Sequence, residues 1–361
     1  MIRACLLPNP RRDAGTVKID LMEMVRQVRN RPKFVPSLPI VTAMTPVNRI
    51  KPLLVAAAFC TAFMAVGWVT RFPYAFPDLQ NYRLGFESGW YVFSVMNLDW
   101  PRFILSEGVW MYGFDELWKR TGDIDKSFFI ISCVSTFLLI YYIYFRTKFI
   151  GAMIFIANPA FVHITIEQIR SGLAAGIYYF AITNRNWYIK SALLILSLSI
   201  HTSFVFFVLF YIGYELSKRF GILRLINKRF FISLAAVFVF AFLVSYLRDG
   251  VLTAVGDERG FIQDDQSSGV LLGVGWTLFL VSFFYLRDRE CDLEFDFYFF
   301  SLNVFMFISS IVIGSYGSRF VAIGIPALAA MNRYIKKEWN YIFCAHYFVF
   351  SMVYFYIWSA S

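Results

Sequence analysis

The sequence predicts an all-α integral membrane protein of about eleven transmembrane helices, some of them short, arranged around an outward-facing cavity. Of the 361 residues, 58% are hydrophobic and 20% aromatic, whereas only 16% are charged. A water-soluble chain of this length has too little interior to bury so much apolar surface. Apolar runs of membrane-spanning length also recur along the chain from residue 53 onward.

The net charge of +10 fits the same fold class. In a soluble protein it would indicate nucleic-acid binding, but in a membrane protein Lys and Arg gather in cytoplasmic loops. We therefore expect the lipid bilayer, and no nucleic acid, as a partner. The cysteines lack metal-ligand spacing, so we expect no disulfide, no metal and no other cofactor. They are Cys5, Cys60, Cys133, Cys291 and Cys344.

Residues 1–52 are expected to form a basic cytoplasmic arm that precedes a membrane domain of residues 53–361. The arm carries ten Lys or Arg and no apolar run of signal-peptide length. Apolar residues between positions 21 and 28 alternate with Arg26 and Arg29, a pattern compatible with a basic amphipathic helix on the membrane surface. A disordered tail, or sequence upstream of a later start, is equally compatible.

The first predicted span, 53–70, is followed by a large external loop, 71–127. This loop contains four tryptophans and three prolines, so we expect one or two helices that lie in the membrane interface, where Trp and Tyr are favoured. It also contains the carboxylates Asp78, Glu87 and Glu107.

Three further spans are predicted at 128–145, 150–164 and 170–183. The second of these should bend at Asn158–Pro159, because proline interrupts helical hydrogen bonding. In the third, Gly172 and Gly176 are spaced to let the helix approach its neighbours closely.

The apolar run 191–214 has the length of a single span, yet a single crossing conflicts with the charge pattern. It would place the basic loop 218–229 outside and invert every later loop. A turn at His201, with Thr202 or Ser203 as a helix cap, makes the run two short helices and returns the basic loop to the inside.

Five more spans complete the predicted topology, at 230–247, 269–286, 295–313, 320–331 and 341–358, with a second external loop at 248–268. The N-terminus is then inside and the C-terminus outside. Of the 34 Lys and Arg residues, 24 fall inside and 10 outside, as the positive-inside rule predicts. The short helices beside His201 and after Arg319 indicate an outward-facing cavity.

This topology brings two arginines, a histidine and three carboxylates to the outer face. The planar guanidinium donates two parallel hydrogen bonds to phosphate oxygens, so a pair of arginines suits a diphosphate. A carboxylate or an imidazole beside them could deprotonate a sugar hydroxyl. The residues are Asp78, Glu87, Glu107, Arg170, His201 and Arg319.

Structural alternatives exist for several of these residues. Arg170 could anchor the helix at the membrane interface or pair with Glu167 one turn earlier. His201 could be a helix cap or a buried hydrogen-bonding group. His163 and His346 lack polar neighbours in the sequence and are expected to be structural. We interpret Asp123-Ile124-Asp125 as a solvated turn and not as a metal-binding motif.

The order of these motifs resembles that of the EpsG/Wzy-type polysaccharide polymerases. The similarity extends over residues 53–331, and its sharpest part is the unit from Ile-Arg to His-x-Ser. Ser171 departs from the pattern, in which Gln is common after the arginine, and the basic arm lies outside it. The motifs are Asp78-x-x-Asn81-Tyr82-x-x-x-Phe86, Glu107-Gly108, Ile169-Arg170-x-Gly172-Leu173-Ala174, Ile200-His201-x-Ser203 and Arg319.

The resemblance implies glycosyl transfer between two lipid-linked oligosaccharides at the outer face of a bacterial cytoplasmic membrane. Arg170 and Arg319 would hold the diphosphate, and His201 would orient it or act as a base. The choice of base among Asp78, Glu87 and Glu107 stays open. The implied substrate-binding residues are Tyr82, Glu87, Gln168 and Ser203.

The implied partners are polyprenyl-diphosphate-linked oligosaccharides, and the resemblance leaves a chain-length-regulating co-polymerase open. Three other functions fit the same sequence. A membrane O-acyltransferase can also place a histidine in an apolar stretch, but it would leave the two external arginines without a role. An O-antigen ligase, or another polyprenyl-phosphate-dependent glycosyltransferase, would differ only in its acceptor. A flippase or other transporter of lipid-linked oligosaccharides would fit the hydropathy, although the polar residues gather at one face and not at the midplane.

Overall fold

The computed structural model describes residues 46–70, 77–96, 98–222, 230–254, 269–288, 291, 293–313 and 317–360. The expected amphipathic helix in the basic arm and most of the second external loop lie outside these ranges. Within them every regular element is a helix, apart from an isolated antiparallel bridge between Arg287 and Ile335. The predicted all-α fold is therefore confirmed for this part of the chain.

Three of the described helices are long and apolar enough to cross a membrane. They are α2 (Pro46–Thr70), α7 (Ile124–Thr147) and α14 (Gly269–Leu286). The bent segment from Ile150 to Glu167 would be a fourth. These helices indicate that the protein associates with a membrane, whereas the eleven crossings expected from the sequence stay a prediction.

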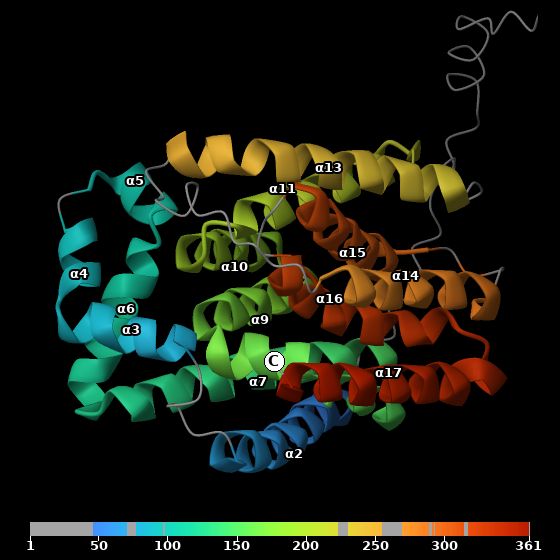
Figure 1. The fold of residues 1–361 in the computed structure, drawn as a ribbon, viewed down its shortest axis with the longest axis horizontal. Helices are drawn as coiled ribbons and strands as arrows, with labels where there is room; N and C mark the ends of the chain where they lie inside the picture. Colours follow the sequence, from blue (N-terminus) through green and yellow to red (C-terminus); the bar gives the residue numbers. More distant parts are fainter. Residues whose placement is uncertain are drawn as a thin grey trace, which may run out of the picture. The chain divides into compact units, whose positions relative to one another are not determined.

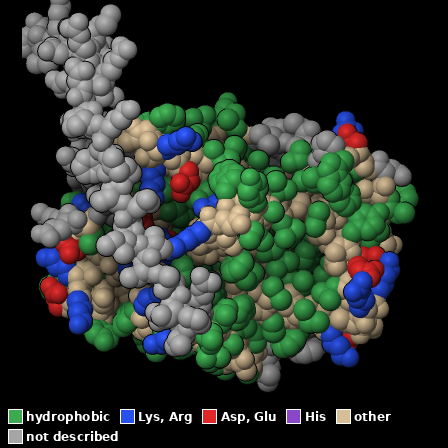
Figure 2. Space-filling model, turned by 180° about the vertical axis from the view of Figure 1, so that it is seen from behind, with side chains coloured by type: hydrophobic (Ala, Val, Ile, Leu, Met, Phe, Trp, Pro, Cys, Tyr) green, Lys and Arg blue, Asp and Glu red, His purple; other side chains and the backbone are tan. Residues whose placement is uncertain are grey.

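Large apolar side chains cover much of the surface. Leu54 on α2 is 64% exposed, Leu271 on α14 is 67% exposed, and Val349 on α17 (Asn340–Ala360) is 61% exposed. Figure 2 shows one face on which hydrophobic side chains fill the middle, while most charged side chains lie toward its two sides. Exposure of so much apolar surface to water is unfavourable, whereas contact of the same surface with lipid chains is favourable.

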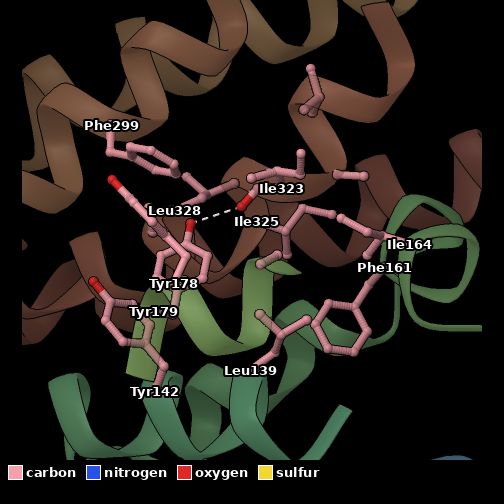
Figure 3. Packing of buried hydrophobic residues seen from close by; sticks show 14 of the residues in the cluster. Leu139, Tyr142, Phe161, Ile164, Tyr178, Tyr179, Phe299, Ile323, Ile325 and Leu328 are labelled. Carbon is pink, nitrogen blue, oxygen red and sulfur yellow. Dashed lines mark hydrogen bonds between the residues drawn. The ribbon is translucent and has the colours of Figure 1, made fainter. Parts of the chain in front are cut away.

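Helix α7 lies at the centre of the fold, where it packs against α2, α9 (Ile169–Thr183) and α16 (Gly317–Met331) (Figure 1). Aromatic side chains fill the junction between α7, α9 and α15 (Phe295–Ile313). Within it, the Tyr179 hydroxyl donates to the carbonyl oxygen of Ile323 at 2.7 Å, which satisfies a polar group in an otherwise apolar core (Figure 3).

Both ends of α7 are capped. Before the helix, Asp123 accepts hydrogen bonds from the backbone N–H groups of Asp125 and Lys126, so the Asp-x-Asp sequence is a helix start. After the helix, Lys148 has a left-handed backbone and its N–H bonds the carbonyl of Tyr144 at 2.8 Å.

The predicted bend at Asn158–Pro159 is confirmed. A 3₁₀ helix, η2 (Ile150–Ile156), precedes it, and α8 (Pro159–Val162) with a π turn, η3 (His163–Glu167), follows at an angle of 75°. The Asn158 side chain caps α8 by accepting from the N–H of Ala160.

The two glycines of α9 allow the close approach predicted for them. A Cβ added at Gly172 would lie 2.2 Å from the backbone oxygen of Ile164 in η3. One added at Gly176 would lie 3.0 Å from Leu138 Cβ on α7. Because the first contact is with backbone, Gly172 holds the start of α9 directly against the bent segment.

The run 191–214 is broken where the charge pattern predicted. Helix α10 (Trp187–Ile200) ends at His201, whose backbone is extended, and α11 (Phe204–Arg219) begins three residues later. The chain doubles back there, because Lys190 near the start of α10 bonds the Tyr211 hydroxyl on α11 at 2.8 Å. Ser203 occupies the position before α11 but its side chain makes no capping hydrogen bond.

The segment expected to be an external loop is more helical than predicted. Its described part contains four helices, α3 (Pro77–Glu87), α4 (Trp90–Val95), α5 (Trp100–Leu105) and α6 (Gly108–Thr121). Apolar residues at helical spacing bury Phe86 and Phe114 against Phe128 at the start of α7. The turn residues in this segment therefore separate short helices.

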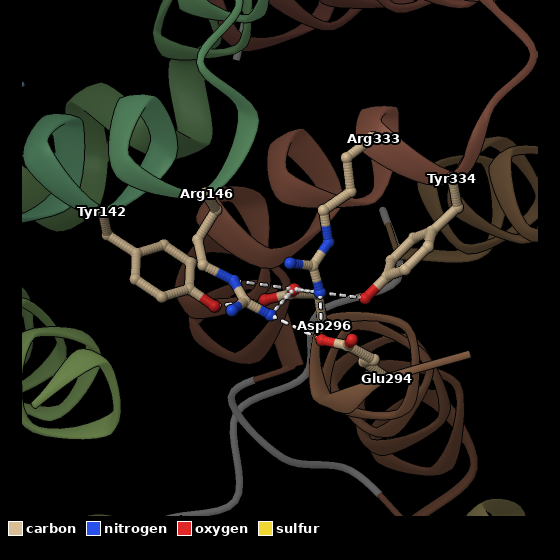
Figure 4. A network of polar contacts seen from close by, with 6 residues as sticks. All are labelled: Tyr142, Arg146, Glu294, Asp296, Arg333 and Tyr334. Atoms are coloured by element: carbon tan, nitrogen blue, oxygen red, sulfur yellow. Dashed lines mark hydrogen bonds and ion pairs between the residues drawn. The ribbon is translucent and has the colours of Figure 1, made fainter. Parts of the chain in front are cut away.

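At the other end of α7, a network of charged side chains joins three helices (Figure 4). Asp296 at the start of α15 is fully buried and accepts from the Tyr142 hydroxyl and from Arg146 Nε at 3.1 Å. Arg333, which follows α16, lies 2.9 Å from the same carboxylate. The network is completed by Glu294 and Tyr334.

The outer member of this network, Glu294, is half-exposed and contacts both arginines. Its partial burial opposes ionisation, but the positive charges of Arg333 and Arg146 outweigh that effect and hold the pKa of Glu294 below its usual value. Two arginines are thus balanced by two carboxylates.

We expect Gly172→Ala to destabilise the protein by about 1 to 3 kcal/mol, because the new methyl group would press on the backbone of η3. Gly113→Ala on α6 is the matched control. Nothing lies within 4 Å of that Cβ position, and alanine favours the helix. The free energy of unfolding in detergent micelles measures both, and an equal effect of the two substitutions would contradict the close contact at Gly172.

Asp296→Asn should destabilise the protein by about 3 kcal/mol or more, because it leaves two arginines facing a buried neutral group. Glu294→Gln removes a charge from the same arginines at a half-exposed position and should cost less than about 1 kcal/mol. Thermal or denaturant unfolding of the two variants tests this difference. Similar losses of unfolding free energy in the two variants would show that the burial of Asp296 does not determine its contribution to stability.

Candidate functional site

The candidate site is built around the carboxylate of Glu107. This residue lies between α5 and α6 and has a left-handed backbone, with φ of 62°, which is uncommon for a residue other than glycine. A Cβ added at the following residue, Gly108, would lie 2.4 Å from the ring of Phe103. The tight turn directs Glu107 into the protein, where it is only 3% exposed.

Arg170, His201 and the backbone of Thr202 donate hydrogen bonds to the Glu107 carboxylate. Arg170 NH1 contacts Oε2, while His201 Nδ1 lies 2.7 Å from Oε1. The backbone N–H of Thr202 also donates to Oε1, at 3.1 Å. An ionised carboxylate only accepts hydrogen bonds, so Nδ1 of His201 carries the hydrogen in this arrangement.

The side chain of Thr202 adds a second connection between the same segments. Its hydroxyl donates to the carbonyl oxygen of Leu105 at 2.6 Å, and lies 3.5 Å from Glu107 Oε1. The turn between α10 and α11 is therefore held to the turn between α5 and α6 by both backbone and side chain.

Arg170, in the first turn of α9, is 9% exposed and lies over the ring of Tyr82, with Cζ 5.5 Å from the ring centroid. Its Nε is buried and has no hydrogen-bond partner among the described residues. The same holds for Oε1 of Gln168, two residues earlier. Buried polar atoms without partners are rare, so this part of the site has unused hydrogen-bonding capacity.

A second ion pair lies beside the first. Arg319 NH2, near the start of α16, lies 3.2 Å from Asp78 Oδ2, and about a quarter of each side chain is exposed. Asp78 and Tyr82 are four residues apart on α3, so they lie on the same face of that helix. The two arginines therefore contact adjacent positions along one side of α3.

Helices α9, α11 and α16 begin at this site, as do α3 at Asp78 and α6 after Glu107. Arg170 is in the first turn of α9, His201 and Thr202 precede α11, and Arg319 is in the first turn of α16. Phe207 of α11 contacts Phe320 of α16, which places these two helix starts close together. The N-terminus of a helix carries a partial positive charge, so the helices add to the positive potential of the arginines.

Comparisons of the chain with protein-family models, with curated proteins and with solved structures return no match. The interpretation of the site is accordingly based on its residues and their geometry.

The structure brings together most of the residues chosen from the sequence, in two adjacent groups. Glu107, Arg170 and His201 form the first with Tyr82, and Asp78 pairs with Arg319 in the second.

Three of the chosen residues, Glu87, Gln168 and Ser203, make no contact with these groups in the described interactions. Glu87 is half-exposed and pairs with Arg83, which also contacts Asp125 at the start of α7. Ser203 is partly buried beside the turn.

Thr202 is a residue of the site that the sequence indicated only as a possible helix cap. Its observed partners, Leu105 and Glu107, lie more than ninety positions away in the chain. The position of Thr202 between His201 and the start of α11 was the feature of the sequence that could have indicated its place in the site.

The structure differs from the two structural alternatives for Arg170 and from the expectation that His163 lacks a polar partner. Arg170 does not pair with Glu167, and it is too buried to be an interfacial anchor. Glu167 instead contacts His163, so His163 does have a polar partner. The π turn brings these two side chains together on the side of the bent segment. His346 lies 3.4 Å from Ser282 Oγ and stacks on Phe279.

A hollow of about 680 Å³ lies between α2 and α7, away from this site. Its lining is apolar, and none of the residues chosen from the sequence contributes to it. The outward-facing cavity expected at the polar residues stays a prediction. The lining residues include Ala57, Cys60, Met64, Phe129 and Cys133.

Proposed function

We propose that the protein polymerises polyprenyl-diphosphate-linked oligosaccharide repeat units into a surface polysaccharide, by glycosyl transfer at the outer face of a bacterial cytoplasmic membrane. The observation that carries this proposal is the pair of arginines, Arg170 and Arg319, at adjacent positions along α3. Guanidinium groups at such positions suit the two phosphates of a diphosphate.

The electrostatics of the site support an anionic substrate. Two arginines and the starts of several helices supply positive charge at one end of the helical domain. This end is also the predicted outer face, where lipid-linked sugars would arrive. The burial of Arg170 strengthens its interaction with a phosphate, because water screens the charge less.

In the proposed reaction, the growing chain on polyprenyl diphosphate is the donor and a single lipid-linked repeat unit is the acceptor. An acceptor hydroxyl oxygen forms a bond to the anomeric carbon of the donor, and the bond from that carbon to the diphosphate oxygen breaks. Polyprenyl diphosphate leaves with the bonding electrons, and its developing charge is stabilised by Arg170 and Arg319. The hydroxyl proton passes to a carboxylate.

The geometry favours Asp78 as this carboxylate. Its side chain is a quarter exposed and lies beside Arg319, so a hydroxyl can reach it next to the bound diphosphate. Glu107 is buried and both its oxygens already accept hydrogen bonds. Glu87 lies outside the two groups of site residues. We assign Glu107 the role of holding Arg170 and His201 in position.

The topology proposed with this function has about eleven crossings, a cytoplasmic N-terminus and an external C-terminus. The helix break at His201 supports it, because a hairpin there puts the basic segment that follows α11 on the inside. The charge network at the far end of α7 then faces the cytoplasm. The substrates are lipid-linked oligosaccharides within the bilayer, with a co-polymerase as a further partner.

Loss of the gene should abolish long polysaccharide chains while single repeat units survive on the cell surface. Arg170→Ala or Arg319→Ala should each reproduce this loss, by about 100-fold or more in polymer, because each removes an electrostatic contact to the leaving group. Gel electrophoresis and mass spectrometry of the surface polysaccharide measure the chain length.

Arg120→Ala is the matched control for these variants, since Arg120 is an exposed arginine on α6 that pairs only with Glu116 in the described contacts. It should polymerise normally, and immunoblots should show equal amounts of all variants in the membrane. Retained polymer after gene loss would refute the proposal. Accumulation of lipid-linked units inside the cell would favour a flippase, and loss of transfer to a lipid core alone would favour a ligase.

Cysteines introduced at Ser203 and Ser217 should react from opposite sides of the membrane in a variant that lacks the native cysteines. Ser203 lies beside the turn before α11, and Ser217 lies in its last turn. A membrane-impermeant maleimide should therefore label the first position in intact cells and the second after lysis. Labelling of both from the outside would contradict the proposed topology.

A further inference from the structure

We propose that the donors around Glu107 form a phosphate-binding pocket, and that the Glu107 carboxylate occupies this pocket until a phosphate ligand displaces it. The inference rests on the proposed function for the identity of the natural ligand, a diphosphate attached to a lipid. Glu107 then has a second role: in the absence of substrate its carboxylate occupies the donors that would otherwise bind phosphate.

The donors that surround the carboxylate are those that proteins use for phosphate. A guanidinium from Arg170, a ring N–H from His201 and a backbone N–H from Thr202 all converge on its two oxygens. The Thr202 hydroxyl lies 3.5 Å from the same oxygen. A phosphate placed here would keep each of these contacts and offer more acceptor oxygens than the carboxylate does.

An unused donor indicates that the carboxylate fills the pocket incompletely. Nε of Arg170 is buried and has no hydrogen-bond partner among the described residues. The planar guanidinium presents its donors as a fork, and a tetrahedral phosphate can engage two of them at once. Of the guanidinium nitrogens of Arg170, only Nη1 bonds Glu107 in the described hydrogen bonds.

The backbone of Glu107 favours its departure from the pocket. Its left-handed conformation is costly for a residue with a side chain, so release of the carboxylate would remove some of the contacts that hold this conformation. When a phosphate takes over the donors, the turn between α5 and α6 can relax. The connection between Thr202 and Leu105 does not involve this carboxylate and can keep the two turns together.

Isothermal titration of the purified full-length chain in detergent with inorganic pyrophosphate tests the competition. Glu107→Gln keeps the size of the side chain but removes its charge, so pyrophosphate should bind about tenfold tighter or more, a gain of about 1.4 kcal/mol. Glu116→Gln is the matched control, because Glu116 is an exposed glutamate on the following helix, and it should bind like the unaltered protein.

Adding Arg170→Ala to Glu107→Gln should abolish the gain, which would locate it in this pocket. An affinity for pyrophosphate that is unchanged or weaker in folded Glu107→Gln would overturn the proposal, because Glu107 would then be only a structural brace.

Hydrogen exchange on the unaltered protein provides a measurement that needs no variant. Pyrophosphate should speed the exchange of the backbone amides around residues 106–109, since Glu107 leaves the pocket. Slower or unchanged exchange there, with pyrophosphate bound, would also overturn the proposal.

Farnesyl diphosphate in the same titration separates the pocket from the proposed function. Tighter binding of farnesyl diphosphate than of pyrophosphate would support a lipid-linked ligand. Equal binding of both, with the gain in Glu107→Gln, would support the pocket and count against a lipid-linked donor. Normal polymerisation by Arg170→Ala would refute the proposed function and leave the result of the pyrophosphate titration standing.

Discussion

The interaction of the buried Glu107 carboxylate with Arg170 and His201 determines how the polar end of this protein is arranged. It joins α6, α9 and the turn before α11, which are far apart in the sequence. Separating such a buried pair leaves an uncompensated charge, so the three segments move together or not at all unless another anion replaces the carboxylate. This single constraint makes Glu107 the structural link between these segments.

Two groups of charged residues lie near opposite ends of helix α7. Near its start, Asp125 pairs with Arg83 of α3, the helix that also contacts both arginines of the candidate site, and near its end lies the network of Arg146, Arg333 and Asp296. The 24 residues of α7 extend about 36 Å, which is close to the thickness of a bilayer. The charges at its end are neutralised by one another, and one arginine in each group, Arg333 and Arg170, has a buried Nε without a hydrogen-bond partner among the described residues.

Hydropathy predicted the helical class, the proline after Asn158 predicted the bend, and charge predicted the break at His201, because each depends on local sequence or on the sign of nearby charge. The close packing of Gly172 was predicted for the same reason. The four helices of the segment before α7 were underestimated, since tryptophans and prolines indicated loops and interfacial segments there.

The site was predictable as a set of residues but not as a set of pairs. Position along the chain indicated Glu167 as a partner of Arg170. In the structure Arg170 instead bonds Glu107, sixty-three positions away, and Glu167 contacts His163. Such pairings depend on how short helices pack at a distance in sequence, which a single sequence does not encode locally. The role of Thr202 was missed for the same reason.

The shared face of α3 has a consequence for the energetics of the two arginines. Because Asp78 and Tyr82 lie one turn apart on an eleven-residue helix, any movement of that helix would change both contacts. The two positions are then thermodynamically linked: whatever occupancy of one does to the affinity of the other, the reverse effect has the same size. A ligand long enough to reach both would experience them as one cooperative unit, and a shorter one would change the affinity of the position that it leaves empty.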